Sequence, residues 1–204
     1  MQTGWTSKEY IIKRKEMTEI DAINKMLRYI GELPIPNDVA IDDLPEGHEA
    51  IIARSVLKET IEQTQEDRWW FNQATINLIP NTDGYISMPP NIISIYSNSK
   101  YLIIGNDLFD VSNQTKIFTS PVRISVLLSL KFEDLPKIVR TYVVLLASKS
   151  LHTSLNGDET TQAELDKEIL TQKYKVDREN TRQSKVNLIK NGRLLDRTSN
   201  PSLI

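Results

Sequence analysis

The chain has 204 residues, 39% hydrophobic and 25% charged, with a formal net charge of −2, a composition typical of one medium-sized globular domain. It contains no cysteine, so disulfides, thiolate catalysis and thiolate metal sites are excluded. No apolar run approaches the ~20 residues of a spanning helix, no apolar N-terminal stretch predicts a secretory signal, and the total charge predicts no overall attraction to nucleic acid.

Charge is distributed unevenly along the chain. Residues 173–204 hold eight basic and three acidic residues, a net charge of +5, which leaves −7 on residues 1–172. The sequence therefore predicts an acidic body and a basic C-terminal end.

Two amphipathic helices are predicted in the first third of the chain. The first, Thr18–Ile30, starts at a Thr18/Asp21 capping pair, keeps its apolar residues on one face and stops at Gly31. A proline-rich loop separates it from the second, Glu49–Asp67, whose acidic C-terminal end opposes the helix dipole.

After the second helix the hydrophobic period changes from 3.6 to two, which indicates strands. Their turns are short and most of them are half polar, which favours a small antiparallel sheet. The predicted strands are Ala74–Ile79, Tyr85–Met88, Ile92–Tyr96, Tyr101–Ile104, Leu108–Val111 and Pro121–Lys131.

Two further helices follow the strands. One runs from Asp134 to about Leu155, with Pro136 in its first turn, and it is apolar almost all round, which predicts burial on most sides. The other runs from about Glu159 to Arg182 or beyond, and its charged, weakly amphipathic pattern is typical of a helix on a surface or at an interface.

This order predicts an α+β fold: a four-helix body interrupted by a small antiparallel β-sheet insertion, with an extended C-terminal tail. The predicted divisions are an N-terminal extension (1–17), a helical body (18–68 and 132–185), an inserted β-sheet subdomain (69–131) and a partner-docking tail (186–204).

The stretch "DRWWFN", residues 67–72, places three aromatic side chains in a row. They could stack on nucleobases, form a membrane-interface belt, or fill a structural corner. Acidic Glu66 and Asp67 precede them, whereas a stacking platform normally adjoins a basic groove. We therefore predict a structural corner made of Trp69, Trp70 and Phe71, with at least two of the three largely buried between helices and sheet.

Catalytic motifs are not found. His48 and His152 lie in separate segments without a metal-binding or triad pattern, and the chain has no glycine-rich phosphate loop. Acidic pairs occur at loops and helix starts, where capping is their usual role. We predict no enzyme activity, metal or cofactor; a carboxylate-dependent hydrolase would require these acidic pairs to converge on one pocket.

The basic C-terminal tail is the feature most typical of binding. A solvated, disordered end is the alternative, but two apolar pairs among the basic residues favour docking on an acidic or apolar groove. The predicted docking residues are Leu188, Ile189, Lys190, Arg193, Leu194, Leu195 and Arg197.

Several sequence segments, in this order, resemble a known family. They are "AINKMLRYIGELPI" (22–35), "DRWWFN", "LIPNTDGYISMPPNIISIY" (78–96) and "KFEDLPKIVRTYVVLLASKSL" (131–151). Together they are similar to tail tubular protein A, the head-to-tail adaptor of short-tailed bacteriophages (podoviruses), over residues 18–175. The chain departs from the family's corner at Trp69, which stands in place of a glycine.

The resemblance implies a virion structural protein without enzymatic activity. Family members form a dodecameric ring beneath the portal, and their C-terminal segment reaches the portal. The implied partners are the portal protein, the tail nozzle protein, the tail fibre protein, further copies of the chain, and genomic DNA that passes through the lumen without sequence-specific binding; no membrane is implied. The implied location is the virion tail at the head-to-tail interface, and the host cytoplasm during assembly.

The residues themselves also leave a different reading open. A non-viral helical adaptor could dock a soluble protein partner through the same basic C-terminal tail, as a stable monomer or dimer that never forms rings.

Overall fold

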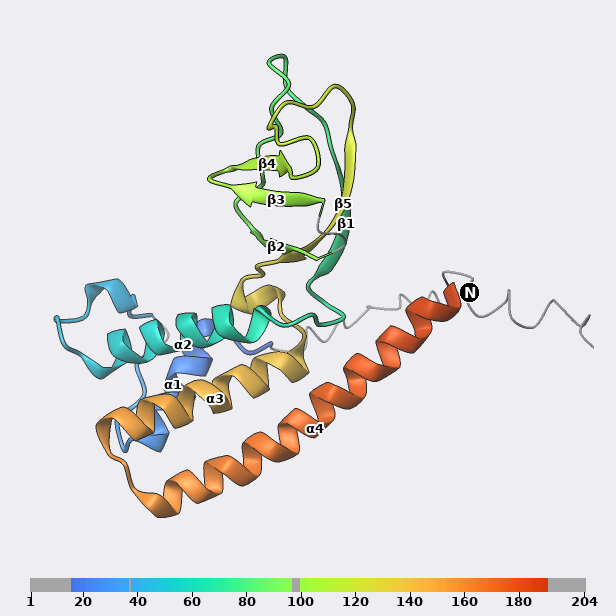
Figure 1. Ribbon diagram of the computed structural model, residues 1–204. Helices are drawn as coiled ribbons and strands as arrows, with labels where there is room; N and C mark the ends of the chain where they lie inside the picture. The colour runs from blue at the N-terminus through green and yellow to red at the C-terminus, as the bar shows by residue number, and fades with distance from the viewer. Residues whose placement is uncertain (1–15, 37, 97–99, 191–204) are drawn as a thin grey trace, which may run out of the picture.

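The structure, a computed structural model, describes residues 16–36, 38–96 and 100–190, with only the backbone for residues 185–190. A helical body carries a β insertion that stands on one of its sides (Figure 1). The chain leaves the body after its second helix and returns before its third, so two crossings connect the two parts. The predicted α+β architecture, four helices interrupted by a β insertion, is confirmed.

Most elements lie within a few residues of their predicted bounds. In chain order they are α1 (Glu19–Tyr29), η1 (Ile41–Asp43), α2 (Glu49–Gln65), β1 (Gln73–Leu78), β2 (Ile92–Ile95), β3 (Tyr101–Ile104), β4 (Asp107–Asp110), β5 (Val122–Leu128), η2 (Phe132–Asp134), α3 (Lys137–Leu155) and α4 (Glu159–Lys190).

Helix α3 is the centre of the helical body, since α1, α2 and α4 all pack against it. Its buried positions lie on every side of the helix, as its apolar sequence predicts. Even Arg140, only 3% exposed, is accommodated: its guanidinium donates to Glu16 Oε2 at 2.8 Å and to the Met17 carbonyl at 3.1 Å. This contact attaches the chain that precedes α1 to the central helix.

The ends of the first two helices are capped by side chains. At α1 the predicted capping box is confirmed: the Asp21 N–H donates to Thr18 Oγ1 at 3.2 Å, and the Thr18 N–H donates to Asp21 Oδ2 at 3.1 Å. At α2 the Ala50 N–H donates to His48 Nδ1 at 3.1 Å. One of the two histidines therefore has a structural role.

The insertion contains two sheets where the sequence predicts one. The first is three-stranded and antiparallel, with the order β1-β5-β2, and the second is the hairpin β3-β4. Side chains from both sheets, including Leu108, Ile124 and Val126, form one apolar core to which Ile86 of the segment before β2 also belongs. The insertion divides because each strand is short and apolar on its inner face, so two layers bury more apolar surface than one flat sheet.

The prediction of a strand at Tyr85–Met88 is wrong. It forms only isolated bridges, Tyr85 with Ile117 and Ser87 with Asp107. The segment changes partner within two residues, and Pro89 and Pro90 follow it directly. Proline has no N–H to donate, so a regular ladder cannot continue.

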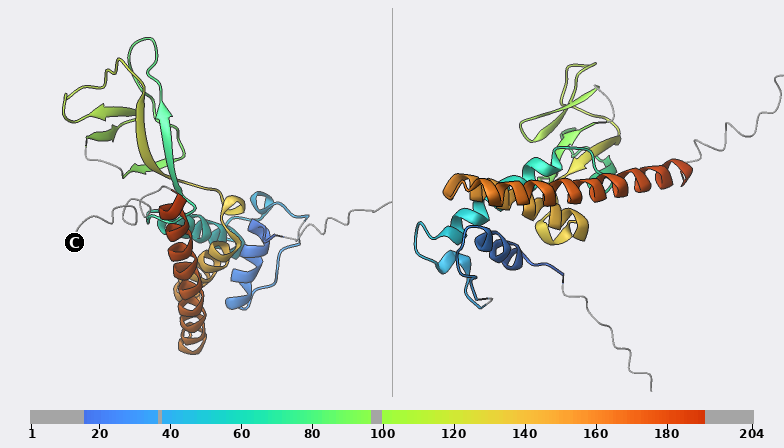
Figure 2. Two further views of the ribbon diagram at one scale, coloured as in Figure 1. Left: turned by 90° about the vertical axis from the view of Figure 1, so that its right-hand side faces the viewer. Right: turned by 90° about the horizontal axis from the view of Figure 1, so that it is seen from below.

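Helix α4 continues past Arg182, the nearest end that the sequence predicts. It runs to Lys190 and so includes the first five residues of the predicted tail. Its 32 residues correspond to about 48 Å at 1.5 Å per residue. It crosses beneath the body and extends past it (Figure 2). The basic residues of the C-terminal end are therefore mostly helical: residues 173–190 carry six basic and two acidic residues.

A buried carboxylate closes the turn after β4. Asp110 is 5% exposed, and it accepts hydrogen bonds from the N–H and the side-chain amide of Asn113, both at 3.0 Å. Lys100 Nζ lies 3.9 Å away. These contacts, the Asn113 N–H above all, hold the pKa of Asp110 below its ordinary value.

This lowered pKa predicts acid sensitivity of the insertion. A carboxyl with a lowered folded-state pKa adds stability above its unfolded pKa, about 3.9, and that stability is lost as pH falls through the folded value. Thermal midpoints measured from about pH 5 to about pH 2 should therefore fall less steeply for Asp110→Asn than for the wild type. Asp83→Asn, at an exposed turn of the same insertion, is the control and should follow the wild type. Parallel curves for Asp110→Asn and the wild type would contradict the assignment.

Candidate assembly site

The aromatic corner lies at the joint between the helical body and the insertion. Trp69 is buried, at 8% exposed, and its indole N–H donates to the Thr64 carbonyl at 2.7 Å. Trp70 and Phe71 are half-buried and pack against the same core. The prediction that at least two of the three would be largely buried is wrong, since only Trp69 is buried. Consecutive side chains diverge, so one core cannot enclose all three.

The three rings also contact one another. Trp69 and Phe71 are nearly parallel, with centroids 6.4 Å apart, and Trp70 meets the Phe71 ring edge-on at 5.1 Å. Such pairs add stability beyond the area they bury. None of the three lies fully in solvent, so their faces are not free as a base-stacking platform would require.

Gln65, the last residue of α2, connects the two crossings directly. Its side chain is fully buried. Its Oε1 accepts from the Leu130 N–H at 2.7 Å, and its Nε2 donates to the Leu130 carbonyl at 3.0 Å. A primary amide presents one acceptor and two donors, so it can pair with both backbone groups of a residue as a strand would. The end of α2, where the chain leaves the helical body, is thereby bonded to Leu130, where the chain returns to it.

Asn72 fixes the outgoing crossing itself and is also fully buried. Its Oδ1 accepts from the Trp69 N–H at 2.9 Å, and its Nδ2 donates to the carbonyls of Gln65 and Asp67 at 2.8 and 3.1 Å. Buried backbone groups that leave a helix need such partners. Asn72 supplies them at the point where α2 ends and β1 begins.

Helix α4 contacts the same joint. Its Asn180 Oδ1 accepts from the Trp70 N–H at 3.0 Å. Earlier in the helix, Leu165 and Val176 are buried, and Gln172 Nε2 donates to the Ile138 carbonyl of α3 at 2.8 Å. Asn180 continues this inward stripe at a spacing of four residues, so it marks the end of the part of α4 that packs on the body.

Sequence reasoning missed Gln65, Asn72 and Asn180. A signal was present at two of them: Gln65 follows Leu57 and Ile61 at intervals of four, and Asn180 follows Val176, so each is a polar residue in an apolar stripe. A polar side chain at such a position faces the core and needs partners; Gln65 is buried and Asn180 is partly buried. The sequence does not reveal that the partners are the two crossings.

The predicted docking residues divide into two groups. Leu188, Ile189 and Lys190 lie in the last turn of α4, where only the backbone is described. Arg193, Leu194, Leu195 and Arg197 lie outside the described residues. The docking role of the tail therefore stays a prediction.

The outer side of α4 carries an apolar pair. Leu170 and Tyr174 are 71% and 69% exposed, one turn apart, and they line an open hollow of about 780 Å³. Lys173, beside them, pairs with Asp177 at 2.7 Å. Lys173 also lines a cleft of about 420 Å³ between α2, α3 and α4, next to Trp69. This side of the body therefore offers both apolar and charged groups to a partner.

The acidic pairs lie on separate elements: Asp42-Asp43 in η1, Glu133-Asp134 in η2 and Asp158-Glu159 at the start of α4. Asp42 pairs with Arg54 at 2.6 Å. Asp158 accepts the Thr161 N–H at 2.8 Å, and its pKa is lowered by the Thr161 side chain above all and then by this N–H. Among the described residues, no three acidic or histidine side chains gather as metal ligands would. Over the same residues, none of the helices combines the length and apolarity needed to cross a membrane.

Truncation of the buried corner residue should destabilise the chain strongly. We expect Trp69→Ala to lower the free energy of unfolding by about 3–5 kcal/mol in urea titrations, because it opens a cavity in the core of the helical body. Trp70→Ala is the matched control and should cost less, since Trp70 is half-buried. Equal losses of unfolding free energy in the two variants would contradict the view that Trp69 is the main buried ring of the corner.

Removal of the buried amide should loosen the joint. We expect Gln65→Leu to cost about 1–3 kcal/mol, because it leaves both backbone groups of Leu130 without their partner. Hydrogen exchange at Leu130 should accelerate. Gln63→Leu, an exposed glutamine two residues earlier that bonds Glu59, should change stability by less than about 0.5 kcal/mol. Unchanged hydrogen exchange at Leu130 in Gln65→Leu would contradict the role of the Gln65 side chain in holding Leu130.

Comparison with known proteins agrees with this architecture. The family model described as "Tail tubular protein" matches residues 20–186, a range that begins one residue into α1, ends four residues before the end of α4, and includes both crossings and the whole insertion. Tail tubular protein A of Klebsiella phage KP34 is 30% identical over 172 residues, covering 83% of this chain and 90% of that protein. The chain therefore belongs to the tail tubular protein family, the structural proteins of bacteriophage tails.

Proposed function

We propose that this chain is the subunit of a head-to-tail adaptor ring. Copies of the chain close into a ring beneath the portal, which connects the head to the tail nozzle and fibres and surrounds a channel for the genome. The C-terminal end of each copy docks on the portal. The family membership supports a role in the tail, and the physical properties of the body and of α4 support this particular role.

The observation that carries the proposal is the projection of α4. The helix is anchored on α3 and at the joint up to Asn180, and it then continues for ten residues to Lys190. Thr181, Arg182 and Ser184 in this part are exposed. A rigid helix holds its end at a fixed distance from the body, so docking costs less conformational entropy than docking of a free tail would. Its basic charge suits an acidic partner surface.

The acidic body suits a channel for DNA. Residues 1–172 carry a net charge of −7. Tight binding to DNA comes from neutralisation of phosphates by basic side chains, so an acidic lining lets DNA pass without sticking. A closed ring also requires two unlike contact faces on each copy. The outer side of α4 and the insertion provide unlike surfaces of this kind.

Truncation of the C-terminal end tests the proposal. Deletion of residues 186–204 should abolish attachment to the portal protein of the same phage, because it removes the last turns of α4 and all the predicted docking residues. The measurement is negative-stain electron microscopy and co-sedimentation of the chain mixed with portal. The full chain should give a second ring stacked on the portal.

Two controls accompany this test. Deletion of residues 191–204 alone keeps α4 whole and separates the helical part from the rest of the segment. The thermal midpoint of each truncated chain should match the wild type, because the last fully buried apolar residue of α4 among those described is Val176. Undiminished portal attachment without residues 186–204 would remove the docking role. A full chain that stays monomeric or dimeric with portal present would instead favour an adaptor for a soluble partner.

A further inference from the structure

The two outer faces of the insertion differ in polarity. On the three-stranded sheet the outward positions of β1 are Gln73, Thr75 and Asn77, all exposed. Their partners on β5 include Ser125 opposite Thr75 and Arg123 opposite Asn77. This is the ordinary arrangement for an antiparallel layer, with an apolar inner face and a polar outer face.

The hairpin β3-β4 does not follow this arrangement. Its outward positions are Leu102 and Ile104 on β3, with Phe109 opposite Leu102, and Val111 just after β4. Leu102, Ile104 and Val111 are 51%, 44% and 39% exposed, and Phe109 is half-buried. Residues at alternate positions of a strand share a face, and so do residues paired across a ladder. We call these four residues the hairpin face.

Further exposed apolar side chains lie beside the hairpin face. The outward Asp107 of β4 is bridged to Ser87, and Tyr85, two residues before Ser87, is bridged to Ile117. Tyr85 and Ile117 are 39% and 55% exposed. Exposed apolar residues scattered singly need no explanation, but neighbours on one face of a sheet indicate an interaction site.

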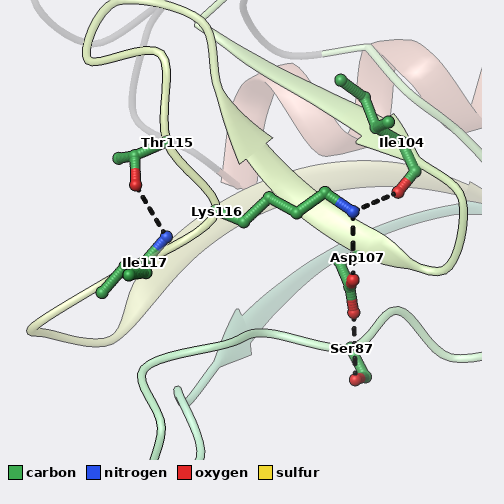
Figure 3. A network of polar contacts seen from close by, with 6 residues as sticks. All are labelled: Ser87, Ile104, Asp107, Thr115, Lys116 and Ile117. Carbon is green, nitrogen blue, oxygen red and sulfur yellow. Dashed lines mark hydrogen bonds and ion pairs between the residues drawn. The ribbon is translucent and has the colours of Figure 1, made fainter.

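The charged groups beside the hairpin face are already satisfied. Lys116 Nζ donates to the Ile104 carbonyl at 3.0 Å and to Asp107 Oδ2 at 3.2 Å, and Ser87 Oγ donates to Asp107 Oδ1 at 3.4 Å (Figure 3). Covering this face with another protein would therefore leave no charge without a partner. The face does not demand a partner of opposite charge.

The net charges of the insertion and of the helical body indicate which partner covers the hairpin face. The insertion, residues 69–131, has seven charged residues, four basic and three acidic, so its net charge is +1. The helical body before residue 173 carries the acidic excess of the chain. Two copies of this chain repel one another through their acidic bodies, but the nearly neutral insertion of one copy can meet a second copy without this repulsion, and depletion of charge is typical of interface cores.

We propose that the hairpin face is a contact between copies, covered by an unlike surface of a second copy of this chain, as a closed ring requires. The proposal rests on the self-assembly in the proposed function. The hairpin face and its neighbours are a few partly exposed side chains, which together cover less than the ~800 Å² that each partner contributes to a stable complex. The contact is therefore weak alone and becomes stable where other contacts hold the copies together, as in a ring on the portal.

Substitutions on the hairpin face test the proposal in the full chain. We expect Leu102→Glu with Ile104→Glu to raise the concentration at which rings form on portal by roughly tenfold or more, because two carboxylates enter an apolar contact on every copy. The measurement is ring occupancy on portal by negative-stain microscopy across a concentration series. Both side chains are about half exposed, so the fold should tolerate the change, and the thermal midpoint checks this.

The opposite sheet provides the matched control. Thr75→Glu with Asn77→Glu adds the same charge to the polar outer face of the insertion and should leave ring formation unchanged. Rings formed equally well by the Leu102/Ile104 variant and the wild type would overturn the contact between copies. Loss of nozzle-protein binding with intact rings would overturn it as well and assign the face to the nozzle. Failure of the wild type to form rings would remove the proposed function and this contact together.

Discussion

The structure depends on how the chain crosses between the helical body and the insertion. At the joint the backbone leaves α2, turns into β1, and later returns from β5, and the polar groups of these irregular segments lie in or near the core. Unpaired buried backbone groups are costly, so each needs a partner. Gln65 and Asn72, both fully buried, supply most of these partners with two side chains. Trp69, whose N–H donates to Asn72, belongs to the core of the helical body.

The same joint connects the insertion with α4. Asn180 bonds the backbone of Trp70 at the outgoing crossing, while Leu165, Gln172 and Val176 fix the helix to the body. A change of angle at the crossing would therefore act on the long helix as well. For a subunit of an assembly, this means that the surfaces on the insertion and the surfaces on α4 keep a defined relation to one another, which closed symmetry requires.

The sequence predicts the helices well because their signals are local. The apolar stripes, the Thr18/Asp21 capping box and the apolar sequence of α3 each determine an element without knowledge of the rest of the chain. Two features depended on distant partners and were not predictable. The insertion separates into two layers because of contacts between β3-β4 and the distant β5 side chains. The buried amide of Gln65 pairs with Leu130, 65 residues later.

The candidate site shows the same division. The aromatic corner was identifiable, because three adjacent aromatics at a change of period indicate a place where packing needs bulk. The hairpin face was not, because short strands such as Tyr101–Ile104 show only that apolar residues occur on both faces. The inward face of β3 is the one whose residues pair with the buried Leu108 and Asp110 of β4. These residues are buried because the three-stranded sheet packs against that face.

The finding that α4 continues to Lys190 alters the physical character of the C-terminal end. As an extended tail, the basic residues would sample many positions and pay the entropy of ordering on docking. As part of a helix anchored at Asn180, those up to Lys190 have their backbone at a fixed place relative to the body before any partner arrives. Copies arranged with symmetry would then present their basic helix ends as a regular set. Each single contact can be weak, since contacts made together reinforce one another through effective concentration. The weakness of the hairpin face alone fits the same logic, because a ring held by many modest contacts forms where its template is and not elsewhere.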